Sequence, residues 1–183
     1  MVDLGGPTPP PGRPFAFRAV VYTIGFLVFI LGVVPSLFHL LGEFSLRRPS
    51  LSQDIALFWS ELRRLVGITI FSGGFLAYVC CSAWLIFFGR GPHVEFDPPT
   101  VFVATGPYRW VRNPVVLCLI TTVLGEAVYL GSIGILLLVI VGMGFAHYQV
   151  TRIEEPRLRL RFGRHYEDYC RTVPRWIPRP PKD

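Results

Sequence analysis

Long uncharged stretches alternate with short polar segments along this chain of 183 residues. Residues 15–41 carry one charge, near their start, followed by 23 uncharged residues, and residues 65–88 carry none. Residues 115–130 are apolar except for Glu126, and the apolar pattern resumes at 133–150. Because about 20 apolar residues in a helix cross the roughly 30 Å hydrocarbon core of a bilayer, the pattern predicts an all-α, polytopic membrane bundle with about four transmembrane helices.

The segments between these stretches predict how the helices are connected. Gly131 and Ser132 form a tight turn, so the last two stretches should fold back as a helical hairpin. Residues 42–64 mix apolar and charged positions, which predicts an interfacial helix leading into the second span. Residues 89–112 are rich in Gly and Pro and predict a folded polar loop. In 156–170, aromatic and arginine positions each recur at helical spacing, which predicts one amphipathic helix on the membrane or over a site.

Composition narrows the class of protein. The chain is 51% hydrophobic and only 16% charged, whereas soluble domains carry about 25% charged residues. Residues 1–14 contain five prolines and three glycines, which predicts a disordered tail outside the fold. Pro35 lies inside the first span and predicts a kink there. The four cysteines have no spacing that would hold a metal.

The charge of +6 indicates membrane topology and lipid contact rather than nucleic acid binding. If the C-terminus is cytoplasmic, four spans place 14 positive residues inside and four, at positions 47, 48, 63 and 64, outside. The positive-inside rule favours this orientation. We therefore expect an integral protein of a bacterial inner membrane with a cytoplasmic C-terminus.

Three polar clusters fall at one expected membrane face, at residues 105–109, 112–114 and 152–156. Two antiparallel arms of near-equal length return the chain to its starting side. Asn113 and Glu154 should therefore be neighbours, although they are 41 residues apart. Acidic side chains beside arginines suit a zwitterionic ligand that carries an ammonium group, a carboxylate and hydroxyls.

Three sequence elements carry a family resemblance. The string TGPYRWVRNP at 105–114, the pair Glu154-Glu155 and the string RLRLRFGRHYEDYCRTVPRWIPR at 157–179 resemble the isoprenylcysteine carboxyl methyltransferase family of integral membrane enzymes. Phospholipid N-methyltransferases are similar over the Asn-Pro and Glu-Glu-Pro elements. The resemblance implies methyl transfer from S-adenosylmethionine to an amphipathic or lipid-like acceptor that enters from the bilayer. It makes 15–88 the N-terminal transmembrane part and 89–183 the cofactor-binding core.

The resemblance also assigns cofactor contacts. The family holds its cofactor through the segment before the TGPY string, the tyrosine of that string, four residues starting at His-Pro or Asn-Pro, and the first acid of the pair. In this chain the corresponding residues are Thr100, Val101, Phe102, Val103, Tyr108, Asn113, Pro114, Val115, Val116 and Glu154. His93 falls where a polar cofactor contact is sometimes found.

The acceptor group is open between a carboxylate, an amine and a hydroxyl. An amine or hydroxyl needs a proton acceptor, for which His147, Glu154 and Glu155 are the candidates. Eukaryotic members place an arginine for the substrate carboxylate four residues before the acid pair, where this chain has Val150. Arg152 is its nearest replacement, and the departure argues against an isoprenylcysteine acceptor. The candidate catalytic residues are thus His147, Glu155 and Arg152.

Two other functions remain open from the sequence. A non-catalytic membrane scaffold or assembly factor would need no cofactor. A nicotinamide-dependent membrane reductase is the second alternative, because sterol reductases look similar in this region.

Overall fold

The computed structural model describes residues 15–41, 53–89 and 101–181 of the chain. Those residues form helices and connecting turns, with no strand among them. In chain order the α-helices are α1 (Phe15–Leu27), α2 (Val34–Leu41), α3 (Gln53–Gly89), α4 (Pro114–Leu130), α5 (Ile133–Gln149), α6 (Glu155–Phe162) and α7 (Arg164–Thr172). Two π-helical segments, η1 (Val28–Val33) and η3 (Val150–Glu154), and a 3-10 turn, η2 (Gly106–Arg109), lie between them.

The all-α membrane prediction is confirmed. Three helical stretches are long and apolar enough to cross a membrane, namely Val21–Leu41, Asp54–Gly89 and Ile133–Phe162, and α4 is a shorter apolar helix. Large apolar side chains point outward along these stretches, including Leu76, Phe145 and Ile140. Apolar side chains that face outward along a spanning helix contact lipid tails, so the molecule is an integral membrane protein.

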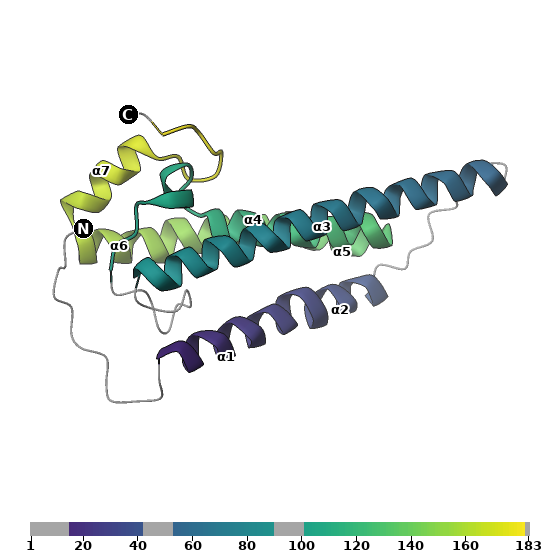
Figure 1. Ribbon diagram of the computed structural model, residues 1–183, viewed down its shortest axis with the longest axis horizontal. Helices are drawn as coiled ribbons and strands as arrows, with labels where there is room; N and C mark the ends of the chain where they lie inside the picture. Colours follow the sequence, from purple (N-terminus) through teal and green to yellow (C-terminus); the bar gives the residue numbers. More distant parts are fainter. Residues whose placement is uncertain (1–14, 42–52, 90–100, 182–183) are drawn as a thin grey trace.

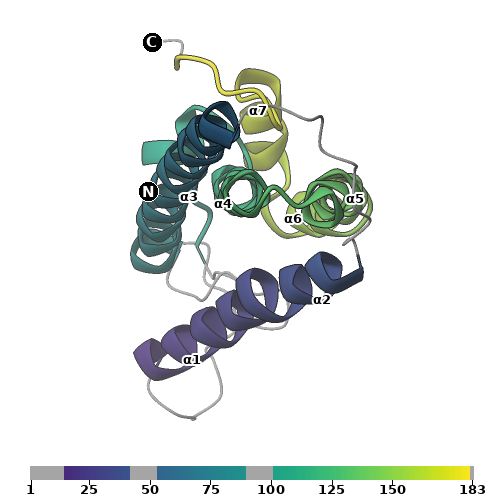
Figure 2. The same ribbon diagram turned by 90° about the vertical axis from the view of Figure 1, so that its right-hand side faces the viewer.

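The predicted hairpin is formed by α4 and α5. Gly131 adopts the left-handed conformation with φ of 63°, and the Ser132 side chain accepts a hydrogen bond from the backbone N–H of Ile135 at 3.3 Å. Ile135 is fully buried in a core with Val123 and Ala127, against which side chains of η1 pack. In Figure 2, α3, α4 and α5 lie side by side with α4 between the other two, and α1 and α2 lie across from them.

Glycines allow α3 and α4 to pack in close antiparallel contact. A Cβ atom on Gly74 of α3 would lie 2.8 Å from the backbone nitrogen of Thr122 of α4. Gly67 faces Tyr129 in the same way, and Gly125 of α4 faces Phe71 of α3. Small residues let transmembrane backbones approach each other, and here they set the position of α4 against the longest helix.

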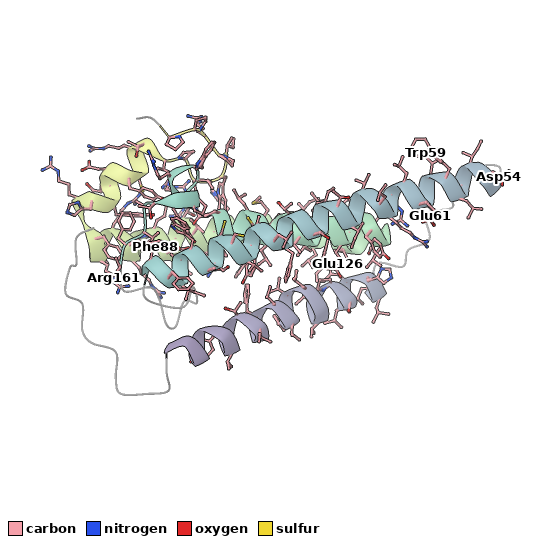
Figure 3. All side chains as sticks on the ribbon, in the orientation of Figure 1. Asp54, Trp59, Glu61, Phe88, Glu126 and Arg161 are labelled. Carbon is pink, nitrogen blue, oxygen red and sulfur yellow. The ribbon has the colours of Figure 1, made fainter. Side chains whose placement is uncertain are left out.

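Two elements differ from the sequence prediction. The described part of the predicted interfacial helix, from Gln53 onward, continues without a break into the second span as one helix of 37 residues, because no Gly or Pro interrupts 53–66. Asp54, Trp59 and Glu61 therefore lie far along α3 from Phe88, which is near the helix end (Figure 3). The predicted amphipathic helix is divided at Gly163, whose φ of 54° is a left-handed value that glycine adopts readily.

The π-helical segment η1 ends two residues before Pro35, where the sequence predicted a kink. A proline nitrogen cannot donate to the carbonyl four residues earlier, so the local hydrogen-bond pattern widens. The predicted disordered tail at 1–14 lies outside the described residues.

One end of the bundle carries most of the polar structure. There α3 ends, α4 begins, and η2, α6 and α7 gather (Figure 1). We call this the site end. It holds the three polar clusters that the sequence placed at one membrane face.

Candidate active site

The hairpin brings the Asn-Pro corner and the acid pair together at the site end. The Arg112 guanidinium, just before α4, lies 2.9 Å from Glu155 at the start of α6. These residues are 43 positions apart in the chain. The structure therefore confirms that the segment containing Asn113 and the segment containing Glu154 are adjacent, through a contact between their neighbours Arg112 and Glu155.

Glu155 is the centre of an ion-pair cluster. Its side chain is 3% exposed, and its two oxygens accept from Nε and Nη2 of Arg175 at 2.6 and 2.9 Å. Arg112 shares Oε1, and Arg159 approaches Oε2 at 3.6 Å. The hydrogen bonds that Arg175 donates to Glu155 raise the pKa of Arg175. Sequence reasoning proposed Glu155 as a catalytic residue, and in the structure both of its oxygens are occupied by arginines.

Residues 173–179, which we call the C-terminal strap, cover this corner. The Arg112 backbone N–H donates to the carbonyl of Pro174 at 2.9 Å, and the Arg179 N–H donates to the carbonyl of Trp110 at 3.0 Å. The Asn113 amide donates to the carbonyl of Arg175 at 3.3 Å. The strap is thus joined to the segment that leads into α4.

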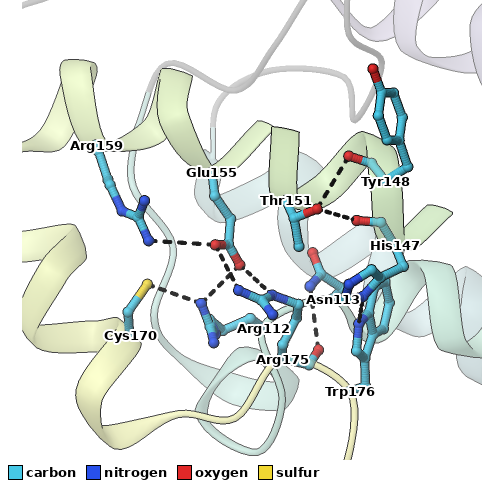
Figure 4. Close-up of polar contacts among 10 residues, drawn as sticks. All are labelled: Arg112, Asn113, His147, Tyr148, Thr151, Glu155, Arg159, Cys170, Arg175 and Trp176. Atoms are coloured by element: carbon cyan, nitrogen blue, oxygen red, sulfur yellow. Dashed lines mark hydrogen bonds and ion pairs between the residues drawn. The ribbon is translucent and has the colours of Figure 1, made fainter. Parts of the chain in front are cut away.

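The strap also reaches α5. Nε1 of Trp176 donates to Nδ1 of His147 at 3.0 Å, as Figure 4 shows beside the Glu155 cluster. Because Nδ1 accepts, a neutral His147 ring carries its proton on Nε2. Sequence reasoning did not single out Arg175 or Trp176. Both residues lie in the string VPRWIPR, which forms the strap. The string alone does not indicate that the strap packs against the Asn-Pro corner.

Tyr108, assigned to the cofactor by the resemblance, is buried in η2 with 7% of its surface exposed. Its backbone carbonyl accepts from the Tyr169 hydroxyl at 2.7 Å, whereas its own hydroxyl has no hydrogen-bond partner within the described part of the chain. Burial raises the pKa of Tyr108, and the nearby Cys81, Tyr169 and Glu154 raise it further. A buried hydroxyl without a partner, within electrostatic reach of Glu154, therefore leaves an unused hydrogen-bonding group at the site end.

A cavity of about 760 Å³ lies at the site end, between the end of α3 and the α6–α7 pair, and Tyr108 is not among its lining residues. Two residues of the predicted cofactor segment, Phe102 and Val103, line it. The other aromatic lining residues are Trp84, Phe88, Phe162 and Tyr169. Arg109, His165 and Asp168 add polar groups to the lining. The cavity is large enough for a nucleoside-sized ligand.

The remaining predicted residues are spread around these features. Pro114 is buried in the first turn of α4, with Val115 and Val116 half-buried beside it. Val101 is half-buried, and its N–H donates to the carbonyl of Gly89 at 2.9 Å. Glu154 and Arg152 are exposed on η3. His93 and Thr100 lie outside the described residues.

The comparisons with known proteins give one match. The family model described as phospholipid methyltransferase matches residues 62–165, which contain both corners of the site but not the strap. No curated protein and no solved structure matches the chain.

Proposed function

Because the chain belongs to the phospholipid methyltransferase family, we propose that it is an integral membrane methyltransferase that uses S-adenosylmethionine and acts on an amphipathic or lipid-like acceptor. The observation that carries this proposal is the contact between Arg112 and Glu155 at 2.9 Å. It places the Asn-Pro element and the acid pair in one polar corner, at the end of a bundle whose outer face is apolar.

The residues present fit the proposed cofactor. The cavity at the site end has aromatic residues and Arg109 in its lining, which suits a nucleoside with hydroxyl groups. The buried Tyr108 hydroxyl, which has no partner among the described residues, offers a further hydrogen-bonding group at that end. Glu154 supplies negative charge for an ammonium group. When bound, the cofactor would supply an electrophilic methyl group. The residues proposed to hold it are Val101, Phe102, Val103, Tyr108, Asn113, Pro114, Val115, Val116 and Glu154, with His93 and Thr100 from the segment outside the described residues.

The chain contributes mainly by positioning and by excluding water. Proximity and alignment of two reactants account for up to about 7–11 kcal/mol of a barrier. A carboxylate acceptor needs no base. For an amine or hydroxyl acceptor, His147 would accept a proton only at Nδ1, so the hydrogen bond from Trp176 would first have to open. Arg152, exposed at the same end, is proposed to hold an anionic group of the acceptor.

Calorimetric titration of the detergent-purified protein with S-adenosylhomocysteine tests the cofactor assignment. Saturable binding is expected, and Glu154→Gln should abolish it. Glu126→Gln is the matched control, because the same change is made on α4 away from its N-terminal corner, and it should bind as the wild type does. No heat at millimolar ligand would favour the scaffold. Saturable binding of a nicotinamide cofactor, together with no binding of S-adenosylhomocysteine, would favour the reductase.

Two further experiments address the acceptor and the orientation. Incubation of a lipid extract with a radiolabelled methyl donor should label an amphipathic product.

Alkaline phosphatase and fluorescent-protein fusions at the C-terminus report its side of the membrane. We propose a bacterial inner membrane with a cytoplasmic C-terminus, for which the fluorescent fusion alone should be active.

A further inference from the structure

We propose that Glu155 and Arg175 are positioning residues for the cofactor, because their ion pair holds the C-terminal strap as one wall of the site. This inference rests on the proposed function. It assigns Glu155 a task different from that of a proton acceptor, and it extends the site to residues beyond the region that matches the family.

The ion pair between Glu155 and Arg175, which we call the clamp, fixes the position of the strap through two hydrogen bonds. A planar guanidinium whose Nε and Nη2 contact the two oxygens of one carboxylate is fixed in orientation as well as in distance. Glu155 is 3% exposed, so solvent competes little for these bonds. A buried carboxylate that lost its arginines would be left uncompensated, which strongly disfavours opening of the clamp.

The same carboxylate orders two backbone segments at once. Arg112, which binds Oε1 of Glu155, directly precedes Asn113, and Arg175 directly precedes Trp176. The orientation of the Asn-Pro corner and that of the strap are therefore set by one buried group. Removal of either arginine releases one segment from Glu155, while the other segment keeps its own ion pair with Glu155.

The strap forms hydrogen bonds with two predicted site residues. The carbonyl of Arg175 accepts from the Asn113 amide, and the Trp176 indole N–H donates to His147. Both Asn113 and His147 were singled out from sequence for cofactor binding or catalysis. If the strap detaches, the Asn113 amide loses the partner that orients it. Cofactor affinity should then fall without any change in a residue that touches the cofactor.

Two backbone amides report the position of the strap without any ligand. The N–H of Arg112 and that of Arg179 are each bonded across the join, to Pro174 and Trp110 respectively. Hydrogen exchange followed by mass spectrometry on the full-length, detergent-purified protein measures their protection. S-adenosylhomocysteine affinity is measured on the same samples by calorimetry.

Four variants separate the clamp from general charge effects. Arg175→Met and Glu155→Gln should speed exchange at both amides and weaken S-adenosylhomocysteine binding at least tenfold. Arg175→Lys keeps the charge but not the two-pronged contact, so it should restore binding in part. Arg159→Met removes the exposed third arginine of the same carboxylate, which lies at 3.6 Å, and should change affinity less than twofold. If Glu155→Gln does not fold, the Arg175 variants alone decide.

The outcomes distinguish this inference from the function on which it rests. Faster exchange in Arg175→Met with unchanged affinity would overturn the positioning role, and unchanged exchange would overturn the clamp itself. A wild-type protein with protected strap amides but no affinity for S-adenosylhomocysteine would contradict the proposed function and the positioning role together, while leaving the clamp established.

Discussion

Substitution of the neighbouring residues Gly73 and Gly74 by alanine should have opposite effects on stability. A Cβ atom at Gly74 would lie 2.8 Å from the Thr122 nitrogen and 3.2 Å from the Cys118 carbonyl oxygen, both backbone atoms of α4. A Cβ atom at Gly73 would meet nothing within 4 Å. The two variants therefore differ in whether the new methyl group meets α4.

The expected difference follows from the close packing of α3 and α4. Ordinary contact begins at 3.4 Å, so the helices would have to separate at Gly74 by at least 0.6 Å, the difference between 3.4 and 2.8 Å. A gap of about 0.5–1 Å forfeits roughly a quarter to a half of each dispersion contact along the interface. Overpacking typically costs about 1–3 kcal/mol, and alanine returns up to about 1 kcal/mol of helix propensity.

Gly74→Ala should therefore lower the free energy of unfolding by up to about 2 kcal/mol, which is the overpacking cost less the propensity gain. Gly73→Ala should leave it unchanged or raise it by up to about 1 kcal/mol, because only the propensity gain acts. Reversible unfolding in mixed micelles with increasing dodecyl sulfate, followed by circular dichroism, measures both. If the two variants differ by less than about 0.5 kcal/mol, the ordinary range for neutral substitutions, the proposed role of Gly74 is refuted.

Three further substitutions test the site and its supports. Tyr108→Phe removes a buried hydroxyl that lacks a partner in the described structure. Thermal unfolding of this variant should show no loss of stability. Calorimetry should show that S-adenosylhomocysteine binds about 2- to 13-fold more weakly, which corresponds to the loss of one hydrogen bond. Gly163→Ala forces a side chain into φ of 54° and should cost about 1–3 kcal/mol in the same thermal assay; unchanged stability would mean that the α6–α7 break relaxes freely. Arg63→Met removes the donor to the carbonyls of Val128 and Tyr129 at the α4–α5 turn; stability should fall by about 1 kcal/mol, but ligand affinity should not change, since the turn lies at the end of α4 opposite the site.

The helical hairpin was predictable from sequence because its determinants are local. Gly131 is tolerant of the left-handed conformation, Ser132 is a good N-cap, and the flanking stretches are uniformly apolar. From the hairpin alone it follows that Asn113 and Glu154 share one membrane end. The structure then adds which neighbouring residue makes the contact, namely Glu155 through Arg112.

The division between α6 and α7 was hidden by the aromatic spacing. Phe162, Tyr166 and Tyr169 all pack into one core with Val173, so their spacing looks like that of a single helix. The backbone turn at Gly163 keeps the aromatic side chains on both sides of it in the same buried cluster. Periodicity reports which side chains face a core, and a bend that keeps them on that core leaves the pattern intact.

The strap was out of reach of sequence reasoning for a different reason. Arg175 is 20 residues from Glu155 and follows the last helix, so no helical register relates the two. Arginine is also the expected residue for any membrane-facing tail with a positive charge. Only the folded backbone distinguishes the arginine that clamps Glu155 from the other arginines of the C-terminal segment, such as Arg157 and Arg161.

The short length of α4 bears on how a substrate reaches the corner. Its 17 residues rise about 25 Å, less than the roughly 30 Å of hydrocarbon in a bilayer. If the leaflet thins around α4, or if its first turn lies below the headgroups, the corner lies toward the depth of the acyl chains. A lipid acceptor could then react while its tails stay immersed, which avoids an extraction cost of about 0.8 kcal/mol for each methylene group.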